Sequence, residues 1–444
     1  MDCLRITGGV RLEGSACVSG SKNASLPIMA ASILADGPVS LAGVPDLVDV
    51  DTLSHLLRRL GIDAARAFDG TLELLTVDSA PTVAPYDLVR RMRASFCVLG
   101  PLVSKRRRAV VSLPGGCNIG TRPVNLHLAG LAALGAEIRI EHGYVIATAR
   151  RLHGAQVDLA GPHGSSVTGT ANVMSAAVLA RGRTVITSAA VEPEIVDLGK
   201  FLIAMGARIE GLGTRVVEIE GVEGLCGASH RVVPDRIEAG TLLIAAAATR
   251  GQASIQGADS SHMTSLLETL TSGGAEITTA STFISLRMPG RARPMSIDAR
   301  PYPGVPTDLQ AQLMALATVA GGTSKVIDSV FPDRFRHVDE LVRLGARAVR
   351  RGASVTVEGV DRLSGAIVTA SDLRASAALV LAGLTAKGET IVRRANHLDR
   401  GYEGLDHKLA QLGARLSRIG RRDHELARGV SAYSQSPLRR PITN

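Results

Sequence analysis

Leu131-Ala132-Ala133-Leu134-Gly135-Ala136-Glu137-Ile138-Arg139-Ile140 reveals how the chain is built, because its pattern returns five more times. A leucine-rich segment ends at a glycine, and an alternating apolar and polar run follows. Glycine after an amphipathic segment is typical of a helix C-terminus, and strict alternation is typical of a half-buried strand. The segment therefore predicts a helix that ends at Gly135, with a strand directly after it.

The six copies are evenly spaced. They end at Gly61, Gly135, Gly206, Gly274, Gly345 and Gly413, so the successive differences are 74, 71, 68, 71 and 68 residues. Each unit also holds an alanine-rich helix, such as 176–180 or 377–382, that is apolar on nearly every side and is expected to be buried. Repeated units bury their faces only against neighbours, and 444 residues are too many for one core. We therefore expect two domains of three units each.

Polar segments precede the buried helices, and four of them carry a cation. These cations are Lys22, Arg93, Arg236 and Arg374. A helix N-terminus carries partial positive charge, so a cation there favours an anion-binding site. Capping by Ser, Thr and Asp is the alternative, but capping leaves the cations unexplained unless an acid answers them. The pattern favours anion sites that face a shared cleft.

Composition narrows the function classes. Aromatic residues make up 2% of the chain and Trp is absent, which argues against a protein that stacks single-stranded bases. The net charge of +9 is compatible with nucleic acid, with an anionic small substrate, or with a generally arginine-rich composition. Neither a signal-peptide pattern nor a membrane-length apolar run is present, and five cysteines without zinc or disulfide spacing suggest a reducing compartment. We expect a cytoplasmic protein, monomeric or weakly oligomeric, without metal, cofactor, nucleic-acid or membrane partner.

The segment 112–123 is a loop with a thiol in it. Three glycines and two prolines between Pro114 and Pro123 exclude a helix or a regular strand. Cys117 stands five positions before Arg122, and a thiolate is populated at neutral pH only beside positive charge. The spacing indicates a reactive cysteine, and the alternative is a buried inert one.

Several motifs together resemble the enolpyruvyl transferase family over residues 3–418. They are Gly20-Ser21-Lys22-Asn23-Ala24, Arg93-Ala94-Ser95, Leu99-Gly100-Pro101-Leu102-Val103, Pro114-Gly115-Gly116-Cys117 with Arg122-Pro123, Glu192-Pro193-Glu194-Ile195-Val196-Asp197, Pro306-Thr307-Asp308-Leu309-Gln310, Asp372-Leu373-Arg374-Ala375-Ser376 and His397-Leu398-Asp399-Arg400-Gly401-Tyr402. The resemblance implies an α/β fold of two domains, each of three βαβαββ units around a pseudo-threefold axis (an inside-out α/β barrel), with the active site between them. The first domain is expected at 22–233 and the second at 1–21 plus 234–420, followed by a disordered basic tail at 421–444.

The resemblance also implies a reaction. Members of the family move the enolpyruvyl group of phosphoenolpyruvate to an acceptor hydroxyl and release phosphate. The Pro-Gly-Gly-Cys loop is that of the nucleotide-sugar branch, so the expected acceptor is the 3-hydroxyl of UDP-N-acetylglucosamine, on the way to peptidoglycan precursors. Alternatives are another uridine nucleotide such as UMP, or a non-catalytic basic protein that binds nucleic acid in a salt-sensitive way.

Roles follow from the resemblance, residue by residue. Cys117 is the expected general acid, which can form an adduct with phosphoenolpyruvate, and Asp308 is the acid–base residue at the acceptor hydroxyl. Asp308 could instead cap its helix, or Thr307 could cap while Asp308 stays free. The catalytic set is Cys117, Asp308, Lys22 and Arg400, and phosphoenolpyruvate is expected at Lys22, Asn23, Arg122, Asp372, Arg374 and Arg400. The nucleotide sugar is expected at Asn23, Arg93, Arg122, Pro123, Val124, Asn125, Leu126, Gly164, Ser165, Ser166, Val167, Asp308 and Val330.

A few residues depart from the family pattern. Asn125 replaces an Asp of the uracil loop and keeps a hydrogen-bonding group without the charge. Many members carry a Lys or Pro near Gly164, before Ser166 and Val167, and the glycine removes a possible diphosphate contact. Val191 replaces an Arg, and Cys97 replaces a Trp. Because these changes lie on the acceptor side, the reaction type is better defined than the acceptor. His127, next to the uracil loop, is expected to be a structural hydrogen-bonding residue.

Overall fold

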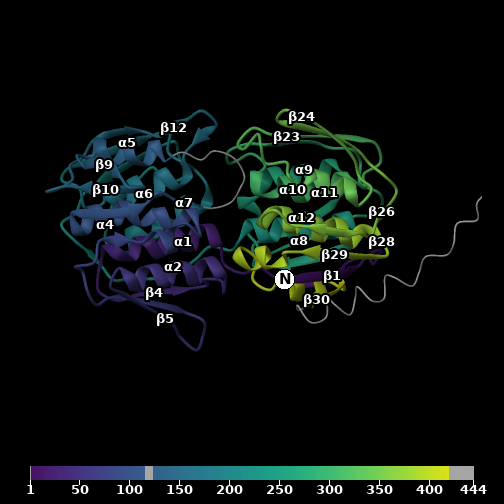
Figure 1. Cartoon of the computed structure of the whole chain (residues 1–444), viewed down its shortest axis with the longest axis horizontal. Coiled ribbons are helices and arrows are strands. Elements are labelled where there is room, and N and C mark those ends of the chain that lie inside the picture. The colour runs from purple at the N-terminus through teal and green to yellow at the C-terminus, as the bar shows by residue number, and fades with distance from the viewer. Residues whose placement is uncertain (1, 116–123, 420–444) are drawn as a thin grey trace, which may run out of the picture.

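The computed structural model describes residues 2–115 and 124–419, which form two lobes side by side (Figure 1). One hydrophobic core is built from residues between Ala24 and Val232. The other combines Leu4 to Ala16 with residues between Ile237 and Ala414. These cores support the domain bounds 22–233 and 1–21 plus 234–420, which remain a prediction, and the tail 421–444 lies outside the described residues.

Within the described residues the chain forms six four-stranded sheets of one pattern. In the spatial order of each sheet, the first strand pairs parallel with the second. The second strand pairs antiparallel with the third, and the third pairs antiparallel with the fourth. The first lobe holds β18 (Ser229–Arg231), β4 (Val39–Ala42), β6 (Leu72–Thr76), β5 (Ile62–Arg66); β7 (Val83–Ala84), β8 (Arg108–Ser112), β10 (Tyr144–Thr148), β9 (Glu137–Glu141); and β11 (Gln156–Asp158), β14 (Arg183–Thr187), β16 (Val216–Glu220), β15 (Arg208–Glu210).

The second lobe repeats the arrangement. Its sheets are β2 (Glu13–Cys17), β19 (Gln252–Gln256), β21 (Phe283–Arg287), β20 (Glu276–Ala280); β22 (Ser296–Ala299), β23 (Thr323–Asp328), β25 (Ser354–Glu358), β24 (Arg347–Arg351); and β27 (Ile367–Thr369), β29 (Glu389–Arg393), β1 (Cys3–Thr7), β30 (Arg415–Ile419). Short pairs are β3 (Ala35–Asp36) with β17 (Leu225–Cys226), β12 (Ala160–Gly161) with β13 (Gly164–Ser165), and β26 (Leu363–Ser364) with β28 (Ala386–Lys387). The predicted six-unit repeat is therefore confirmed.

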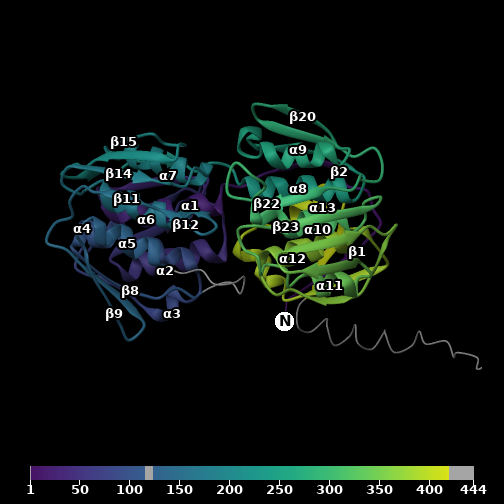
Figure 2. The ribbon, with the colours of Figure 1, turned by 90° about the horizontal axis from the view of Figure 1, so that it is seen from above.

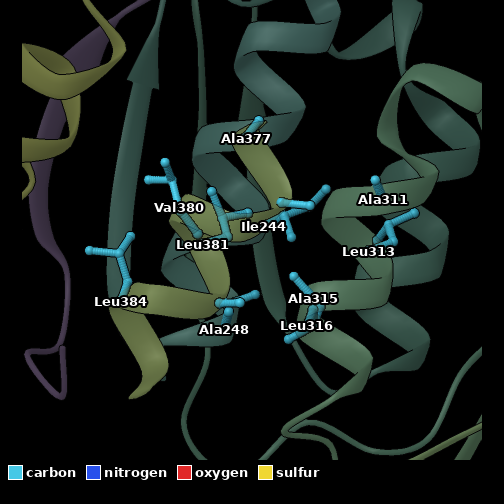
Figure 3. Close-up of a cluster of buried hydrophobic side chains, with 14 of the residues drawn as sticks. Ile244, Ala248, Ala311, Leu313, Ala315, Leu316, Ala377, Val380, Leu381 and Leu384 are labelled. Atoms are coloured by element: carbon cyan, nitrogen blue, oxygen red, sulfur yellow. The ribbon is translucent and has the colours of Figure 1, made fainter. Parts of the chain in front are cut away.

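Alanine-rich helices fill the centre of each lobe. They are α1 (Lys22–Ala31) and α6 (Val167–Ala177) in the first lobe, and α8 (Arg236–Ala248), α10 (Thr307–Ala317) and α12 (Leu373–Thr385) in the second. The third inner helix of the first lobe, α4 (Leu99–Arg106), has no alanine but buries Leu99, Gly100, Pro101, Leu102 and Val103. Figure 3 shows Ile244, Leu316 and Leu381 of α8, α10 and α12 meeting in one cluster. Small side chains let three helices approach one another closely, which favours a densely packed centre.

Outer helices cover the sheets. They are α2 (Val48–Arg59), α5 (Asn125–Ala133), α7 (Pro193–Ala204), α9 (Thr264–Ser272), α11 (Val338–Arg343) and α13 (Leu405–Gln411); short turns are α3 (Tyr86–Val89), η1 (Ser32–Leu34), η2 (Arg93–Val98), η3 (Ser260–His262) and η4 (Ala395–Arg400). The six repeat glycines all adopt positive φ, between 78° and 107°. That left-handed conformation is open to glycine at little cost, which explains why a glycine ends every outer helix.

The chain crosses between the lobes twice, and the two crossings lie side by side. Ser21 N donates to Val233 O at 2.7 Å, and Asp235 N donates to Ser19 O at 2.9 Å. Seen from above, α1 and α8 lie in separate lobes on either side of these crossings (Figure 2). Among the described residues, no helix combines the length and apolar character that a bilayer span needs.

Candidate active site

Lys22 and Arg400 come from different lobes and meet on one carboxylate. Ser21 caps α1 by accepting from Ala24 N at 3.3 Å, which sets Lys22 at the helix start. Lys22 Nζ lies 2.6 Å from Asp49 Oδ2, and Arg400 Nε lies 3.0 Å from Asp49 Oδ1. Asp49 stands in the first turn of α2 and was not identified from the sequence, since acids are common there for helix-dipole reasons alone.

Asp308 is held by two guanidinium groups. Arg334 Nη1 lies 2.8 Å from Asp308 Oδ1, and Arg374 Nη2 lies 2.8 Å from Asp308 Oδ2. Burial opposes ionisation, but Arg374 and Arg334 hold the pKa of Asp308 well below its usual value. The carboxyl is therefore ionised at neutral pH. Arg334 is a second site residue that the sequence motifs do not identify. It follows Asp333 in a loop, where no periodic pattern marks it.

Neither Thr307 nor Asp308 caps α10, so the capping alternative is wrong. The residue at the cap is Pro306, and no side-chain bond is made there. Thr307 Oγ1 instead donates to Asp328 Oδ2 at 2.6 Å. The side chains are drawn away from the helix end because stronger charged partners lie on the neighbouring strand and loop.

Asp372 orients the start of α12. It accepts hydrogen bonds from Arg374 N at 3.0 Å and from Ala375 N at 3.1 Å. The guanidinium of Arg374 lies 5.1 Å from the centre of the Tyr402 ring, and its Nη1 is buried without a partner among the described residues. His337 lines a small cavity beside Arg374. Burial lowers the pKa of His337 to about 4, so this ring is neutral at pH 7. The cavity is lined by Ala311, Arg334, Arg336, His337, Asp372, Arg374 and Ala375, and its charge suits an anionic group.

The residues expected at the nucleotide gather on the first lobe. Val124 is the cap position of α5, Asn125 begins that helix and is exposed, and Leu126 is half-buried. Ser166 caps α6 by accepting from Gly169 N at 3.1 Å, and Val167 follows with 37% exposure. Of the other residues expected there, Asn23 is exposed, Arg93 is half-buried at the start of η2, and Ser165 lies in β13, directly before Ser166. Val330, in the second lobe, donates from its N to Asp328 Oδ1 at 3.0 Å.

Gly164 brings the two lobes into contact on this side. Its φ is +110°, and a Cβ built on it would lie 2.6 Å from Pro301 Cγ of the second lobe. No larger residue fits here without displacing the Pro301 ring. The glycine therefore allows the β12–β13 hairpin to approach Pro301 of the other lobe closely.

His127 makes a structural network, in line with its expected role. Its Nδ1 lies 2.8 Å from Asn172 Nδ2, its Nε2 lies 3.1 Å from Thr168 Oγ1, and it packs edge-on against Phe96. Burial and the charge of Arg93 lower its pKa to about 3, so the ring stays neutral. This network ties α5 and α6 to η2.

Three of the four cations at the helix starts form ion pairs with acids that are buried or half-buried. Besides the pairs of Lys22 and Arg374 described above, Arg236 Nε lies 2.9 Å from Glu194 Oε1, and Arg236 Nη2 lies 3.2 Å from Glu194 Oε2. Glu194 belongs to α7 of the first lobe, so this pair also joins the lobes. Free anion sites at these helix starts are thus limited by carboxylates of the protein itself.

Cys117, Arg122 and Pro123 lie outside the described residues. Gly115 ends the described segment before them. Within the parts that are described, no group of three His, Cys, Asp or Glu side chains is placed to hold a metal ion.

Two lobes of βαβαββ units, with cations and carboxylates meeting between them, define a group of transferases, and comparison with known proteins gives the family. The model of the family described as EPSP synthase (3-phosphoshikimate 1-carboxyvinyltransferase) matches residues 6–409, and the chain belongs to this family. Curated relatives named UDP-N-acetylglucosamine 1-carboxyvinyltransferase are 52% identical in Anaeromyxobacter sp. (strain K) and 51% in Anaeromyxobacter dehalogenans (strain 2CP-1 / ATCC BAA-258), each over 423 residues, 94% of this chain and 100% of the relative. The chain is therefore an enzyme, a transferase.

Solved structures agree with the fold. The enolpyruvyl transferase NikO from Streptomyces tendae is 27% identical with a TM-score of 0.86, covering 94% of this chain and 99% of its own. An EPSP synthase from Acinetobacter baumannii is 18% identical with a TM-score of 0.72, covering 95% and 100%, and shows the shared fold alone. The predicted fold class is confirmed.

Proposed function

We propose that the chain transfers the enolpyruvyl group of phosphoenolpyruvate to the 3-hydroxyl of UDP-N-acetylglucosamine and releases phosphate. One observation carries this choice: the chain is 52% identical, across the whole length of the relative, to a UDP-N-acetylglucosamine 1-carboxyvinyltransferase. The product would be a precursor of peptidoglycan, made in the cytoplasm.

The reaction needs one acid, one base and a set of cations. Carbon 3 of phosphoenolpyruvate gains a proton, which makes carbon 2 electrophilic, and the acceptor hydroxyl loses a proton as it attacks carbon 2. The tetrahedral adduct then loses phosphate together with a carbon 3 proton. Phosphate and carboxylate both carry negative charge, so their binding groups must be cationic and shielded from water.

The cations divide into two groups on this proposal. Lys22 and Arg400 take the phosphate, together with Arg122, which is assigned from its motif. Arg334 and Arg374 take the carboxylate, since the guanidinium fork matches two carboxylate oxygens. The carboxylate of Asp308 supports the assignment of Arg334 and Arg374 to a carboxylate, because it already pairs with both arginines at 2.8 Å.

Asp308 is the proposed base at the acceptor hydroxyl. Its carboxylate is ionised, but two arginines lower its proton affinity. A substrate carboxylate that competes for Arg334 and Arg374 would loosen this hold and raise the pKa of Asp308 at the moment it must accept a proton. Cys117 is the proposed proton donor to carbon 3, on the strength of its glycine loop and of Arg122 nearby in sequence.

Uridine recognition is assigned to the first lobe. Val124, Asn125 and Leu126 would contact the uracil, and the stretch 164–167 would approach the diphosphate. Arg93 and Asn23 complete the nucleotide-sugar site from the same lobe, and Val330 from the other.

A phosphate-release assay with two acceptors tests the proposal. The enzyme is supplied with phosphoenolpyruvate and either UDP-N-acetylglucosamine or UMP. Turnover with the nucleotide sugar is expected, and turnover with UMP alone would reassign the acceptor. Asn125, Gly164 and Val191 are the reason for including UMP.

A further inference from the structure

Asp49 is a buried acid that takes no step in the proposed reaction. It is 3% exposed, although an acid in the first helical turn gains from the helix dipole while remaining in water. Asp51, in the same turn of α2, is exposed. The helix dipole therefore does not explain why Asp49 is buried.

Both carboxylate oxygens of Asp49 contact cations. Lys22 Nζ lies 2.6 Å from Oδ2, while Arg400 Nε lies 3.0 Å from Oδ1 and Arg400 Nη2 lies 3.4 Å from Oδ2. Arg400 Nη2 also donates to Arg91 O at 3.1 Å, again in the first lobe. One carboxylate of the first lobe thus fixes a cation from each lobe.

Lys22 and Arg400 both contact Asp49, and without its carboxylate the two cations would repel each other. The repulsion is large where water is scarce, and a buried charge that loses its partner is strongly destabilised. Asp49 removes this repulsion and leaves the trio with one net positive charge for an incoming anion. Because its oxygens fix the directions of both side chains, the carboxylate also determines where that anion is bound.

We propose that Asp49 is a positioning residue of the enolpyruvyl transfer, which holds Lys22 and Arg400 together at the phosphate end of the phosphoenolpyruvate site and joins the two lobes there. This inference rests on the proposed function. It predicts an effect on phosphoenolpyruvate that the acceptor does not share, because among the described residues the ion pairs of Asp49 are with the two proposed phosphate-binding cations.

The test compares Asp49→Asn, Asp49→Glu and the matched control Asp51→Asn. Asp49→Asn should raise the KM for phosphoenolpyruvate about 10- to 100-fold and leave the KM for the acceptor within about twofold. Asp49→Glu, which keeps the charge, should raise the KM for phosphoenolpyruvate less than Asp49→Asn does. If the Asn variant does not fold, the Glu variant is compared with Asp51→Asn instead. Asp51→Asn should behave as the unaltered enzyme.

Two results would overturn the proposal. One is kinetics of Asp49→Asn equal to those of Asp51→Asn. The other is an equal rise of both KM values with a lower midpoint of thermal unfolding, which a merely structural role produces. If the unaltered enzyme releases no phosphate with either acceptor, the proposed function fails by itself. The claim that Asp49 joins the two lobes is then tested by small-angle scattering without substrates. A larger radius of gyration for Asp49→Asn than for Asp51→Asn supports this contact, and equal values refute it.

Discussion

Asp308 and Arg374 belong to different units of the second lobe, yet Arg374 Nη2 lies 2.8 Å from Asp308 Oδ2. The two residues stand second in α10 and α12, and these two helices pack against each other. The pair places a carboxylate that can accept a proton beside a cation that can bind a substrate anion.

Removing the carboxylate of Asp308 should slow the chemical step. We expect Asp308→Asn to lower kcat by about 10²- to 10⁴-fold, the usual contribution of a general base, with a smaller change in the KM for phosphoenolpyruvate. The measurement is steady-state phosphate release. Asp333→Asn is the control, since Asp333 lies one residue before Arg334 and, within the part of the chain that the structure describes, forms its ion pair with the exposed Arg350. A kcat near that of the control would exclude Asp308 as the base.

Glu238 should make stability depend on pH. Its carboxylate accepts from Ser19 N at 2.7 Å and lies 2.7 Å from Lys408 Nζ, and burial nevertheless raises its pKa to about 7. The unfolded chain releases this proton near its ordinary value of 4.5, so between the two values the folded state binds more protons and loses stability as the pH rises.

The free energy of unfolding should therefore fall by about 3 kcal/mol more in the unaltered protein than in Glu238→Gln between about pH 4.5 and 7.5. Urea unfolding across this range measures the difference. Glu358→Gln, at an exposed pair with Arg347, should follow the unaltered protein. Parallel curves for Glu238→Gln and the unaltered protein would contradict the prediction.

Cysteine reactivity should single out Cys117. Burial raises the pKa of Cys97 to about 12 and raises that of Cys3 as well, so both should resist alkylation. Cys117→Ala should abolish turnover and protect against the epoxide fosfomycin, whereas Cys117→Asp, still an acid, should keep activity and resist alkylation. Mass spectrometry locates the adduct.

The exposed Cys17 and Cys226 provide the control for this experiment. A Cys17→Ser/Cys226→Ser variant should be inactivated by fosfomycin as fast as the unaltered enzyme. Loss of activity with the adduct on another cysteine would refute the assignment of Cys117.

Gly164 should control the acceptor side of the cleft. A Cβ at this position would lie 2.6 Å from Pro301 Cγ, so Gly164→Ala should raise the KM for the acceptor about tenfold and leave that for phosphoenolpyruvate unchanged. Adding Pro301→Ala removes the clashing atom and should restore part of the affinity. Gly70→Ala is the control, because Gly70 also has positive φ but nothing lies within 4 Å of its Cβ position. Failure of Pro301→Ala to help would assign the effect to backbone strain alone.

Much of the fold could be read from the sequence because its signals are local. A helix, a glycine with positive φ and an alternating strand follow one another within about a dozen residues, and the pattern recurs. The sequence also predicts Lys22, Arg374 and Arg400 as site residues, since each stands in a motif. Asp49 and Arg334 were missed, because an acid in a first helical turn and an arginine in a loop carry no distinguishing spacing.

The sequence by itself determined the repeating unit, the buried alanine-rich helices and the positions of the cations at helix starts, because hydrogen bonding and burial along one segment depend on neighbouring residues. Only the tertiary structure decided which acid forms an ion pair with which cation. Arg400 pairs with Asp49 across 351 positions of sequence, and Arg374 pairs with Asp308 across 66. Such ion pairs depend on how lobes and helices pack, and no local periodicity encodes that packing.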